Sequence, residues 1–531
     1  MRLSGNHLIR RSAAGLALVT ALTACSGGGS SDPAAAPTGA SERGGTPKSG
    51  GTLTVALSAI PPVLDPYAST LQLNWAPARN VCEPLFDVST SNEVKPVLAE
   101  SFTYDKKLTY VIKLRSGVKF HNGQAFTAAD AVANIERFEK TPGNGSFLAD
   151  NLASVQATGD LEVTLTLKAP SAIVPTLLTT AYIMPASVQK NRPITEPAND
   201  LICTGPYQLE SYQPDRQVTL KRYDGYAART DPGDGATGKK VAYADKIVFT
   251  PIPESSAQVQ AVQTGQADAT LALPLDTYPT LESAKAAALL SPSQASTVVF
   301  NKAAGPMAKL EMRQAFQAAL DMAQVMGAGF GDKQFYLLDG SVMPKTAGVW
   351  YATEGTESYN KPDPAKVKAL LAKAGYKGEK IVWLTTKADS IWYGPVEPAA
   401  QLLKTAGFNI ELQVVDQATV FERRTDPKQF DLFSSGFPTY ADPLLLPYLQ
   451  DGFPGNWTNP QKNALLGQLA TEPDSAKRVE IWKQIQALVY SDVPFLKFGT
   501  VRPLVGASPR THFENADGML SGYYNVWIDE A

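Results

Sequence analysis

The sequence predicts a mixed α/β protein with more than one lobe. Its 531 residues are enough for about three or four structural units of ~150 residues each. Segments with the two-residue alternation of strands are interleaved with amphipathic helical segments along the chain. Between residues 380 and 415, two strand patterns flank one helical pattern, which predicts parallel strands joined by a right-handed crossover.

The composition is that of a folded, slightly acidic protein. Hydrophobic residues make up 44% of the chain and charged residues 19%, so a large core can form and wholesale disorder is excluded. The chain has 48 basic and 51 acidic residues and no basic run, which argues against a nucleic-acid partner. Three His and three Cys leave little material for a metal cluster, and we expect neither a metal nor a cofactor.

The N-terminal residues have the pattern of an export signal. A basic start is followed by the apolar segment 13–24, which is too short to span a bilayer and is typical of a secretory signal peptide. The segment ends in Leu22-Thr23-Ala24-Cys25, which resembles a bacterial lipobox. That resemblance implies a signal peptide over 1–24, cleavage before Cys25 and lipidation of its thiol. An ordinary signal peptide with an incidental Cys is the alternative.

The next segment, 25–50, predicts a flexible tether. It consists largely of Gly, Ser, Ala, Pro and Thr, which cannot pack a core. No later stretch has 18 consecutive apolar residues, so we expect the body to be held at the cell membrane, on its extracytoplasmic face, by the lipid anchor alone. Arg10-Arg11 leaves the export route open between the Sec and twin-arginine pathways.

Five segments of the body are predicted as strands, because β-branched and apolar residues alternate with polar ones along them. They are residues 52–58, 108–115, 162–168, 217–223 and 245–252.

Capping residues mark the ends of two helices. Thr127 and Asp130 resemble a capping box with Asp in place of Glu. Asp363 at the N-cap, Pro364 at the first helical position and Gly375 after the last turn delimit the second helix. The later elements are a strand over 380–386, a helix over 396–406, a strand over 408–415 and an amphipathic helix over 475–490.

One glycine-rich segment matches two phosphate-binding patterns. Residues 233–240, GDGATGKK, fit both the dinucleotide fingerprint and the start of a P-loop. Both motifs need a strand before them and a helix after them, whereas a strand follows here and Lys240 replaces the Ser or Thr that would hold Mg²⁺. We therefore predict an exposed glycine-rich loop. The hydrolase and zinc-protease motifs are absent from the sequence, and nothing in it points to an enzyme.

Two cysteines remain after lipidation. An exported protein experiences oxidising conditions, so Cys82 and Cys203 are either disulfide-bonded or two buried thiols, and the sequence leaves both open.

Residues 114–132, LRSGVKFHNGQAFTAADAV, closely resemble the signature of the extracytoplasmic solute-binding proteins of the peptide/nickel/oligopeptide class, family 5, which serve ABC importers. Ala125 stands where Pro is usual, and we interpret His121 of this segment as structural. Similar family segments follow the same order over residues 51–531. They are residues 64–66, 204–207, 259–271, 312–321 and 440–443.

The resemblance implies a two-lobed periplasmic-binding-protein fold of the Venus-flytrap type, with a third subdomain inserted in the first lobe. The strands that cross between the lobes would be 296–301 and 493–500. The implied parts are lobe I over 51–85, 200–300 and 491–531, the inserted subdomain over 86–199, and lobe II over 301–490.

The implied function is that of a membrane-anchored, extracellular binding component of an ABC importer. It would capture peptides or a related small solute by lobe closure and deliver the ligand to the permease. Its partners would be the permease and ATPase subunits and the ligand, and we expect a monomer with no catalytic residue. A ligand sensor or a cell-surface enzyme that reuses the fold is the alternative.

The resemblance implies ligand contacts in three segments, with packing inside a lobe as the alternative for each aromatic. The candidates are Thr70, Leu71, Gln72, Asn74, Trp75, Trp392, Tyr393, Gly436, Phe437, Pro438, Thr439 and Tyr440.

Position 439 departs from the family pattern. Peptide-binding relatives usually have Asp three residues before the Asp-Pro pair, where it holds the ligand's free ammonium group, and this chain has Thr439. Either another acid takes this role, with Asp442 and Asp389 as candidates, or the ligand lacks a free amino terminus. Nickel is disfavoured because the body has only two His.

Overall fold

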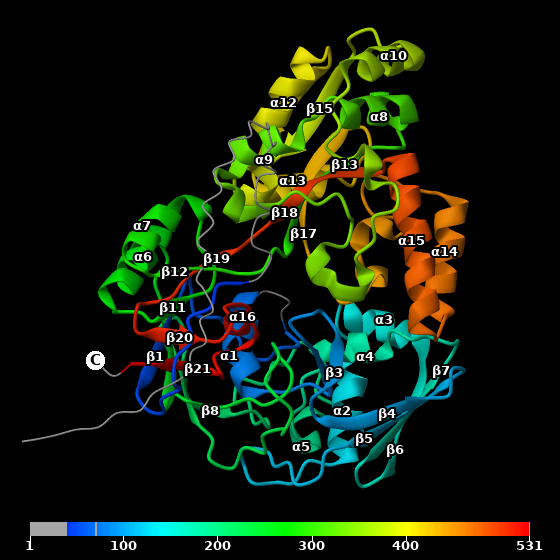
Figure 1. Ribbon diagram of the computed structural model, residues 1–531. Coiled ribbons are helices and arrows are strands. Elements are labelled where there is room, and N and C mark those ends of the chain that lie inside the picture. Colours follow the sequence, from blue (N-terminus) through cyan, green and yellow to red (C-terminus); the bar gives the residue numbers. More distant parts are fainter. Residues whose placement is uncertain (1–39, 69–71, 530–531) are drawn as a thin grey trace, which may run out of the picture. The chain divides into compact units, whose positions relative to one another are not determined.

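The computed structural model describes residues 40–68 and 72–529 (Figure 1). The predicted signal peptide, Cys25 and most of the predicted tether lie outside the described residues, as do Thr70 and Leu71.

A five-stranded sheet contains the first strand of the body. Its strands, in spatial order, are β11 (Ala269–Thr270), β1 (Thr52–Leu57), β10 (Lys246–Pro251), β9 (Gln217–Arg222) and β8 (Tyr207–Gln213). β1 runs parallel to both neighbours, and β9 and β8 continue the sheet antiparallel. Leu53 and Val55 on β1 are fully buried, as their alternation with Thr predicts.

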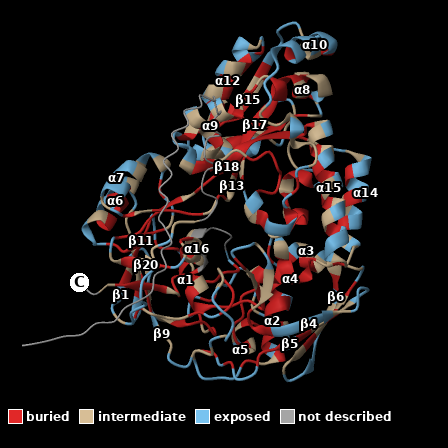
Figure 2. Cartoon of the chain, viewed as in Figure 1, coloured by how far each residue is buried: buried red, intermediate tan, exposed pale blue. Residues whose placement is uncertain are grey.

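Helices and a short hairpin accompany this sheet. They are α1 (Gln72–Val81), α6 (Ser255–Thr264), α7 (Tyr278–Ser283), α16 (Asp517–Ser521), β20 (Thr511–Phe513) and β21 (Val526–Ile528). In Figure 2 buried residues gather along the strands, while the outer faces of the helices are exposed.

A second sheet is antiparallel throughout. Its strands, in spatial order, are β4 (Ala99–Tyr104), β5 (Thr109–Leu114), β7 (Glu162–Leu167) and β6 (Leu152–Gly159). The hairpin β2 (Phe86–Val88) and β3 (Val94–Pro96) precedes it. The accompanying helices are α2 (Ala128–Phe138), α3 (Asn144–Asn151), α4 (Val174–Leu177) and α5 (Ala186–Gln189).

A third sheet has six strands and mixed direction. In spatial order they are β14 (Tyr336–Leu337), β18 (Phe495–Val501), β13 (Gln294–Phe300), β17 (Leu432–Pro438), β15 (Lys380–Thr385) and β16 (Asn409–Val414). Its helices are α8 (Leu310–Ala318), α9 (Met322–Phe330), α10 (Pro364–Ala374), α11 (Ser390–Tyr393), α12 (Val396–Thr405), α13 (Gln417–Arg423), α14 (Pro460–Thr471) and α15 (Ser475–Asp492).

Two chain segments connect the five-stranded and six-stranded sheets. They form a short antiparallel ladder, β12 (Ala287–Leu289) with β19 (Leu504–Gly506), and then pair again as β13 and β18. The predicted crossing segments 296–301 and 493–500 overlap β13 and β18. Every residue of β18 is buried, which fits a segment enclosed by structure on both sides.

Local sequence signals placed several elements correctly. The Asp363 carboxylate accepts a hydrogen bond from the Lys366 amide at 2.9 Å, and Gly375 ends α10 in the left-handed region at φ 65°. β15 and β16 are parallel with α12 between them, as the crossover prediction requires. The Thr127 amide donates to the Asp130 carboxylate at 2.8 Å, so Asp serves in place of Glu at the start of α2.

The packed body begins before the predicted boundary at residue 51. The Ser41 amide donates to the Leu289 carbonyl at 2.7 Å, and the Arg43 guanidinium donates to the carbonyls of Ser508 at 2.7 Å and Lys285 at 2.9 Å. The tether prediction is therefore corrected for these residues. Composition indicated a flexible segment, but one Arg among small residues finds backbone acceptors from distant parts of the chain.

The glycine-rich segment 233–240 is a loop without a following helix, as predicted. Gly233 and Lys239 are exposed, but the prediction of exposure is wrong for other residues of the segment. Ala236, Thr237 and Gly238 are buried, and so is Lys240. The Lys240 ammonium lies 3.3 Å from the buried Glu83 carboxylate, an ion pair that the local sequence pattern does not reveal.

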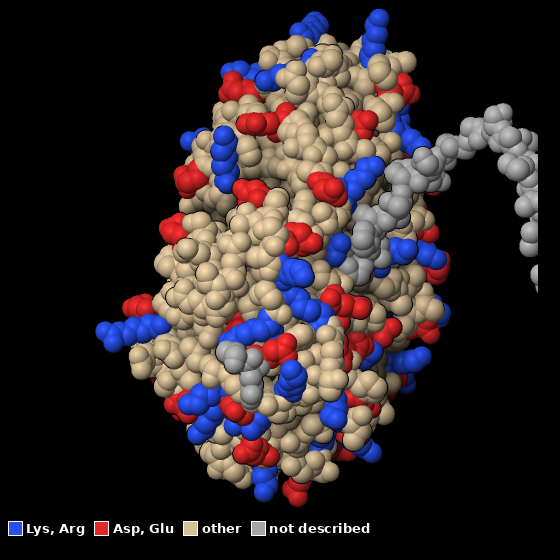
Figure 3. Space-filling model, turned by 60° about the vertical axis from the view of Figure 1, so that its left-hand side comes forward, with Lys and Arg blue, Asp and Glu red and all other residues tan. Residues whose placement is uncertain are grey.

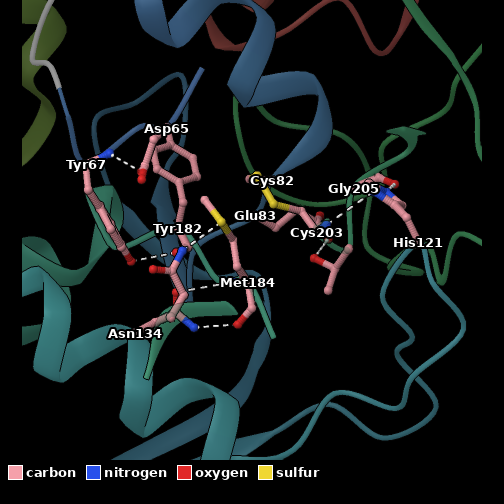
Figure 4. Close-up of a disulfide and its surroundings, with 12 residues drawn as sticks. Asp65, Tyr67, Cys82, Glu83, His121, Asn134, Tyr182, Met184, Cys203 and Gly205 are labelled. Atoms are coloured by element: carbon pink, nitrogen blue, oxygen red, sulfur yellow. Dashed lines mark hydrogen bonds between the residues drawn. A yellow bond between two sulfur atoms is a disulfide. The ribbon is translucent and has the colours of Figure 1, made fainter. Parts of the chain in front are cut away.

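Cys82 and Cys203 form a disulfide that joins the end of α1 to the segment before β8 (Figure 4). The neighbouring His121 ring accepts the Cys203 amide at Nδ1, 3.3 Å, and its Nε2 lies 3.0 Å from the Gly205 carbonyl, to which it donates. Burial lowers the pKa of His121, which favours this neutral tautomer. The contacts are those of a structural residue.

Candidate ligand-binding cavity

A cavity of about 1010 Å³ is lined by segments that are far apart in the sequence. One group belongs to the α1 region and the helices near the four-stranded sheet. It comprises residues 66–68, 75, 79, 87–90, 92, 138, 141–144, 176, 179, 180, 235 and 236. The other group belongs to the connecting segment, the region around the six-stranded sheet and α16. It comprises residues 291–293, 346, 438–441, 445 and 517.

Helix α1 contributes an aromatic ring and a cation to the cavity. Trp75 and Arg79 are four residues apart and therefore share a helix face, with the guanidinium 5.3 Å from the indole centroid. The Trp75 Nε1 donates to the Pro66 carbonyl at 3.3 Å, and its ring meets Tyr182 edge-on at 6.3 Å. These contacts fix Trp75 as a wall of the cavity.

The turn after β2 brings polar side chains to the cavity. Thr90 donates from its hydroxyl to Asp234 at 2.5 Å, and its amide donates to the same carboxylate at 3.0 Å. Gly235 lies at φ 61°, and a Cβ there would stand 3.0 Å from the Thr90 nitrogen, so this close approach needs glycine.

Asn92 connects the two groups of lining residues. Its side-chain Nδ2 donates to the Tyr440 carbonyl at 2.8 Å, across 348 positions of the sequence. Asn92 has φ 62°, a left-handed conformation that Asn tolerates better than most residues. The bond therefore joins the turn after β2 to the end of β17 at the edge of the cavity.

Most threonine hydroxyls in the wall donate to nearby carbonyls. The Thr141 hydroxyl donates to Phe138 at 2.7 Å, and the Thr179 hydroxyl donates to Thr176 at 2.8 Å. The hydrogen of such a hydroxyl is already used in a hydrogen bond, whereas its lone pairs remain free. These hydroxyls therefore face a ligand mainly as acceptors. This part of the wall suits a ligand that brings its own N–H or O–H donors.

Hydrogen bonds to the segment between β12 and β13 hold the cavity residue Thr439 after the end of β17. The Thr439 amide and hydroxyl both donate to the Ser293 carbonyl, at 2.8 and 3.2 Å. Ser291 donates from its amide and hydroxyl to Asp517 at 2.8 and 2.5 Å. Burial raises the pKa of Tyr440, so its phenol remains a neutral donor.

The charged side chain of Asp87 in the cavity wall is influenced by the buried ion pair between Lys240 and Glu83. Desolvation raises the pKa of Asp87, although Arg79 and Lys240 oppose that shift. Burial lowers the pKa of Arg79, but Tyr182 and Asp87 outweigh it, and the net shift is upward. Among the described residues, the wall thus combines one cation, Arg79, with the acids Asp87 and Asp517. On the face of the molecule drawn in Figure 3, acidic and basic groups are interspersed.

Two features are absent from the described residues. No group of three or more His, Cys, Asp or Glu side chains there is arranged to hold a metal ion. Within the same residues, no helix is both long and apolar enough to cross a bilayer.

Residues 93–456 match the model of the Bacterial extracellular solute-binding proteins, family 5 Middle. This chain belongs to family 5 of the bacterial extracellular solute-binding proteins. The family resemblance predicted from the sequence is confirmed. Family 5 is a family of substrate-binding transport proteins rather than of enzymes.

Named relatives agree with this membership. The probable peptide ABC transporter periplasmic-binding protein y4tO of Sinorhizobium fredii is 29% identical over 382 residues, which are 70% of this chain and 71% of that protein. The glutathione-binding protein GsiB of Escherichia coli O6:K15:H31 is 27% identical over 494 residues, covering 88% and 91%. The crystal structure of the ABC transporter substrate-binding protein CtaP from Listeria monocytogenes has a TM-score of 0.81 at 21% identity, over 91% of this chain and 100% of that chain. The predicted two-lobed fold is confirmed.

Four predicted ligand contacts of this family 5 protein line the cavity. They are Trp75, Pro438, Thr439 and Tyr440. Gln72 begins α1, but the structure does not describe its side chain. Thr70 and Leu71 lie outside the described residues. For these residues the predicted role in binding stays a prediction.

The other predicted contacts among the described residues do not line the cavity. Asn74 is buried and donates to the Val63 carbonyl at 2.9 Å, and Tyr393 donates to Glu397 at 2.6 Å. Trp392 is 7% exposed and covers Gly436, where a Cβ would stand 2.8 Å from its Nε1. Phe437 packs against Tyr448 with ring centroids 4.5 Å apart.

The prediction that residues 436–440 add a ligand strand meets a constraint. β17 pairs with β13 along its whole length, from Leu432 to Pro438. On its other side β15 pairs only with Leu432 and Phe433. A ligand strand could therefore use only the second edge, beyond Phe433.

Several lining residues were not predicted from the sequence. Asp87 and Thr90 lie in a short hairpin with no pattern of its own, Thr141 lies between α2 and α3, and Thr179 lies in a short 3₁₀ helix after α4. Their one sequence signal is a high content of Ser, Thr and Asn in turns, which is also typical of ordinary loops.

Proposed function

We propose that this protein is the solute-binding component of an ABC importer, which captures peptides or a related small solute and delivers the ligand to the permease. The observation that carries the proposal is the cavity of about 1010 Å³, lined from both sides of the paired segments β12–β13 and β18–β19. Its volume is at the upper end of the range for small-molecule sites, which suits a ligand larger than one amino acid.

The proposed mechanism is closure of two lobes on the ligand. A ligand that contacts both groups of lining residues binds the closed form more tightly, and the equilibrium shifts by that difference in affinity. The hydrogen bond from Asn92 to the Tyr440 carbonyl is one contact that separation of the lobes would break. The two connecting segments would supply the hinge, because they are the covalent links between the sheets.

Peptides are the proposed ligand class for two reasons. The relative y4tO carries the name of a probable peptide transporter component, and GsiB is named for binding glutathione, itself a small peptide. The acceptor-rich threonine wall and the opposite charges of Arg79 and Asp87 suit a ligand with amide N–H groups and charged ends.

Further parts of the proposal concern location and organisation. We propose lipidation of Cys25, extracytoplasmic anchoring, a monomeric state and the domain boundaries given from the sequence, with the body extended to include Ser41 and Arg43. The disulfide between Cys82 and Cys203 supports an oxidising compartment.

Native mass spectrometry of the protein purified from cells tests the ligand class. We expect a retained mass that dissociates on unfolding and that fragments as a peptide. A retained sugar or metal chelate would contradict the peptide proposal.

Labelling of growing cells with radioactive palmitate tests the lipid anchor. We expect the label on the wild-type protein and its loss in Cys25→Ser, and unchanged labelling in the variant would contradict the anchor.

A further inference from the structure

A ligand with a free ammonium group needs a carboxylate in the cavity wall. The end of β17 does not supply one, because Thr439 is neutral and both its amide and its hydroxyl donate to the Ser293 carbonyl. A neutral hydroxyl cannot make the charge-assisted bond that offsets desolvation of an ammonium group.

The two acids proposed from the sequence for this role are committed elsewhere. Asp442 accepts from Arg478 at 2.7 and 3.2 Å and is 1% exposed. Asp389 accepts from the Ile391 amide at 2.8 Å and caps α11. Neither lines the cavity.

Two acids among the described residues do line the cavity, Asp87 and Asp517, and they differ in the number of hydrogen bonds that they accept. Asp517 receives both donors of Ser291, at 2.8 and 2.5 Å. Asp87 receives one hydrogen bond within the described part of the chain, from the Val88 amide at 2.8 Å. A carboxylate offers about four acceptor positions, so Asp87 has most of its capacity left for a ligand.

The surroundings of Asp87 suit a bound cation. It lies on β2, partly buried, with the neutral donors and acceptors of the Ser89–Asn92 turn following it in the cavity wall. Desolvation raises the pKa of Asp87 although Arg79 and Lys240 lower it, and an ammonium group bonded to the carboxylate would act in the same direction as these two cations.

We infer that Asp87 receives the protonated amine of the ligand, so that the site takes peptides with a free amino terminus. This inference rests on the proposed function and names the group that reads the ligand. An ammonium group supplies three donors, and Asp87 has one filled acceptor position among the described residues, whereas Asp517 has two and Asp442 has three. Asp87 thereby takes the place that the neutral Thr439 leaves open.

The test compares Asp87→Asn with the wild-type protein and with the matched variant Asp517→Asn. Each full-length protein is incubated with a mixture of tri- to pentapeptides, and with the same mixture after acetylation of its amines. Retained peptides are quantified by mass spectrometry, and thermal unfolding verifies that each variant is folded.

We expect Asp87→Asn to weaken retention of the free-amine mixture about 30-fold, as expected for loss of one partner of a buried charge pair. Retention of the acetylated mixture should be weak in the wild type and unchanged by Asp87→Asn. Asp517→Asn should change retention of the two mixtures by the same factor.

The outcomes separate the two proposals. Equal retention of free and acetylated peptides by the wild type, unchanged in Asp87→Asn, would overturn the role of Asp87 and leave the peptide-binding function standing. A selective loss in Asp517→Asn instead would also overturn it. If the folded wild type retains neither mixture, the proposed function fails, and the inference fails with it.

Discussion

Glu83 lies between α1 and β2, Asp87 lies four residues further on β2, and the surroundings of the two acids differ. Glu83 is 1% exposed and is satisfied by Lys240 at 3.3 Å, by the Thr204 hydroxyl at 3.1 Å and by the Tyr226 hydroxyl at 2.9 Å. Asp87 faces the cavity and accepts one backbone hydrogen bond among the described residues. A buried acid with a full set of partners supports the fold, whereas an acid left short of partners in a cavity is available to a ligand.

The largest effect is expected from Glu83→Ala. The change leaves Lys240 buried without its anion, so the free energy of unfolding should fall by about 3–5 kcal/mol in urea denaturation. The double variant Glu83→Leu/Lys240→Met removes both charges and should lose much less. A loss under about 1 kcal/mol for the single variant would show that Glu83 is not a structural acid.

A similar or smaller effect is expected from removing the disulfide next to Glu83. Cys82→Ala/Cys203→Ala should lower the free energy of unfolding by about 2–5 kcal/mol, because the bond closes a long loop in the unfolded chain. Peptide retention should be unchanged, since neither Cys lines the cavity. Equal unfolding midpoints for both proteins, with and without reductant, would contradict this expectation.

A rescue experiment sharpens the contrast between position 87 and position 439. The double variant Asp87→Asn/Thr439→Asp should bind free-amine peptides about tenfold more tightly than Asp87→Asn alone, because one charge-assisted bond is regained. Calorimetry with a retained peptide measures it. Thr439→Asn in the same background is the control and should restore nothing; equal recovery in both would argue against a role for charge.

The smallest effect is the pH dependence of stability due to Asp87. Its pKa is raised in the folded protein by desolvation, against the opposing effects of Arg79 and Lys240, with Glu83 adding to the rise. The folded state therefore binds the proton more tightly than the unfolded chain. The contribution to stability is full below the unfolded value of 3.8 and is lost as pH rises through the folded pKa.

Asp87→Asn should remove this dependence in the ligand-free protein. Unfolding midpoints of the variant should exceed those of the wild type near neutral pH, and the difference should shrink as pH falls toward 4. A difference that grows on acidification would contradict the direction of the pKa shift.

Much of the fold follows from local sequence signals. The Asp363, Pro364 and Gly375 signals delimit α10, and the alternation in residues 380–415 places β15, α12 and β16. These signals work because capping and periodicity act over a few residues.

The cavity depends on contacts that no local pattern encodes. Asn92 and Tyr440 both line the cavity, and the Asn92 side chain reaches the Tyr440 carbonyl from 348 positions away. Family resemblance therefore located Trp75 and the end of β17, but it did not single out Asp87. Its role emerges only when the hydrogen bonds of each acid are compared in the folded protein.

A crystal structure of the protein with a free-amine peptide that it retains would show where the ligand binds and which acid holds its amine. We expect the peptide in the cavity of about 1010 Å³, in contact with both groups of lining residues, and its ammonium nitrogen within about 3.2 Å of the Asp87 carboxylate. A peptide bound outside this cavity would overturn the proposed binding site, and an ammonium group in contact with a different acid would overturn the role of Asp87.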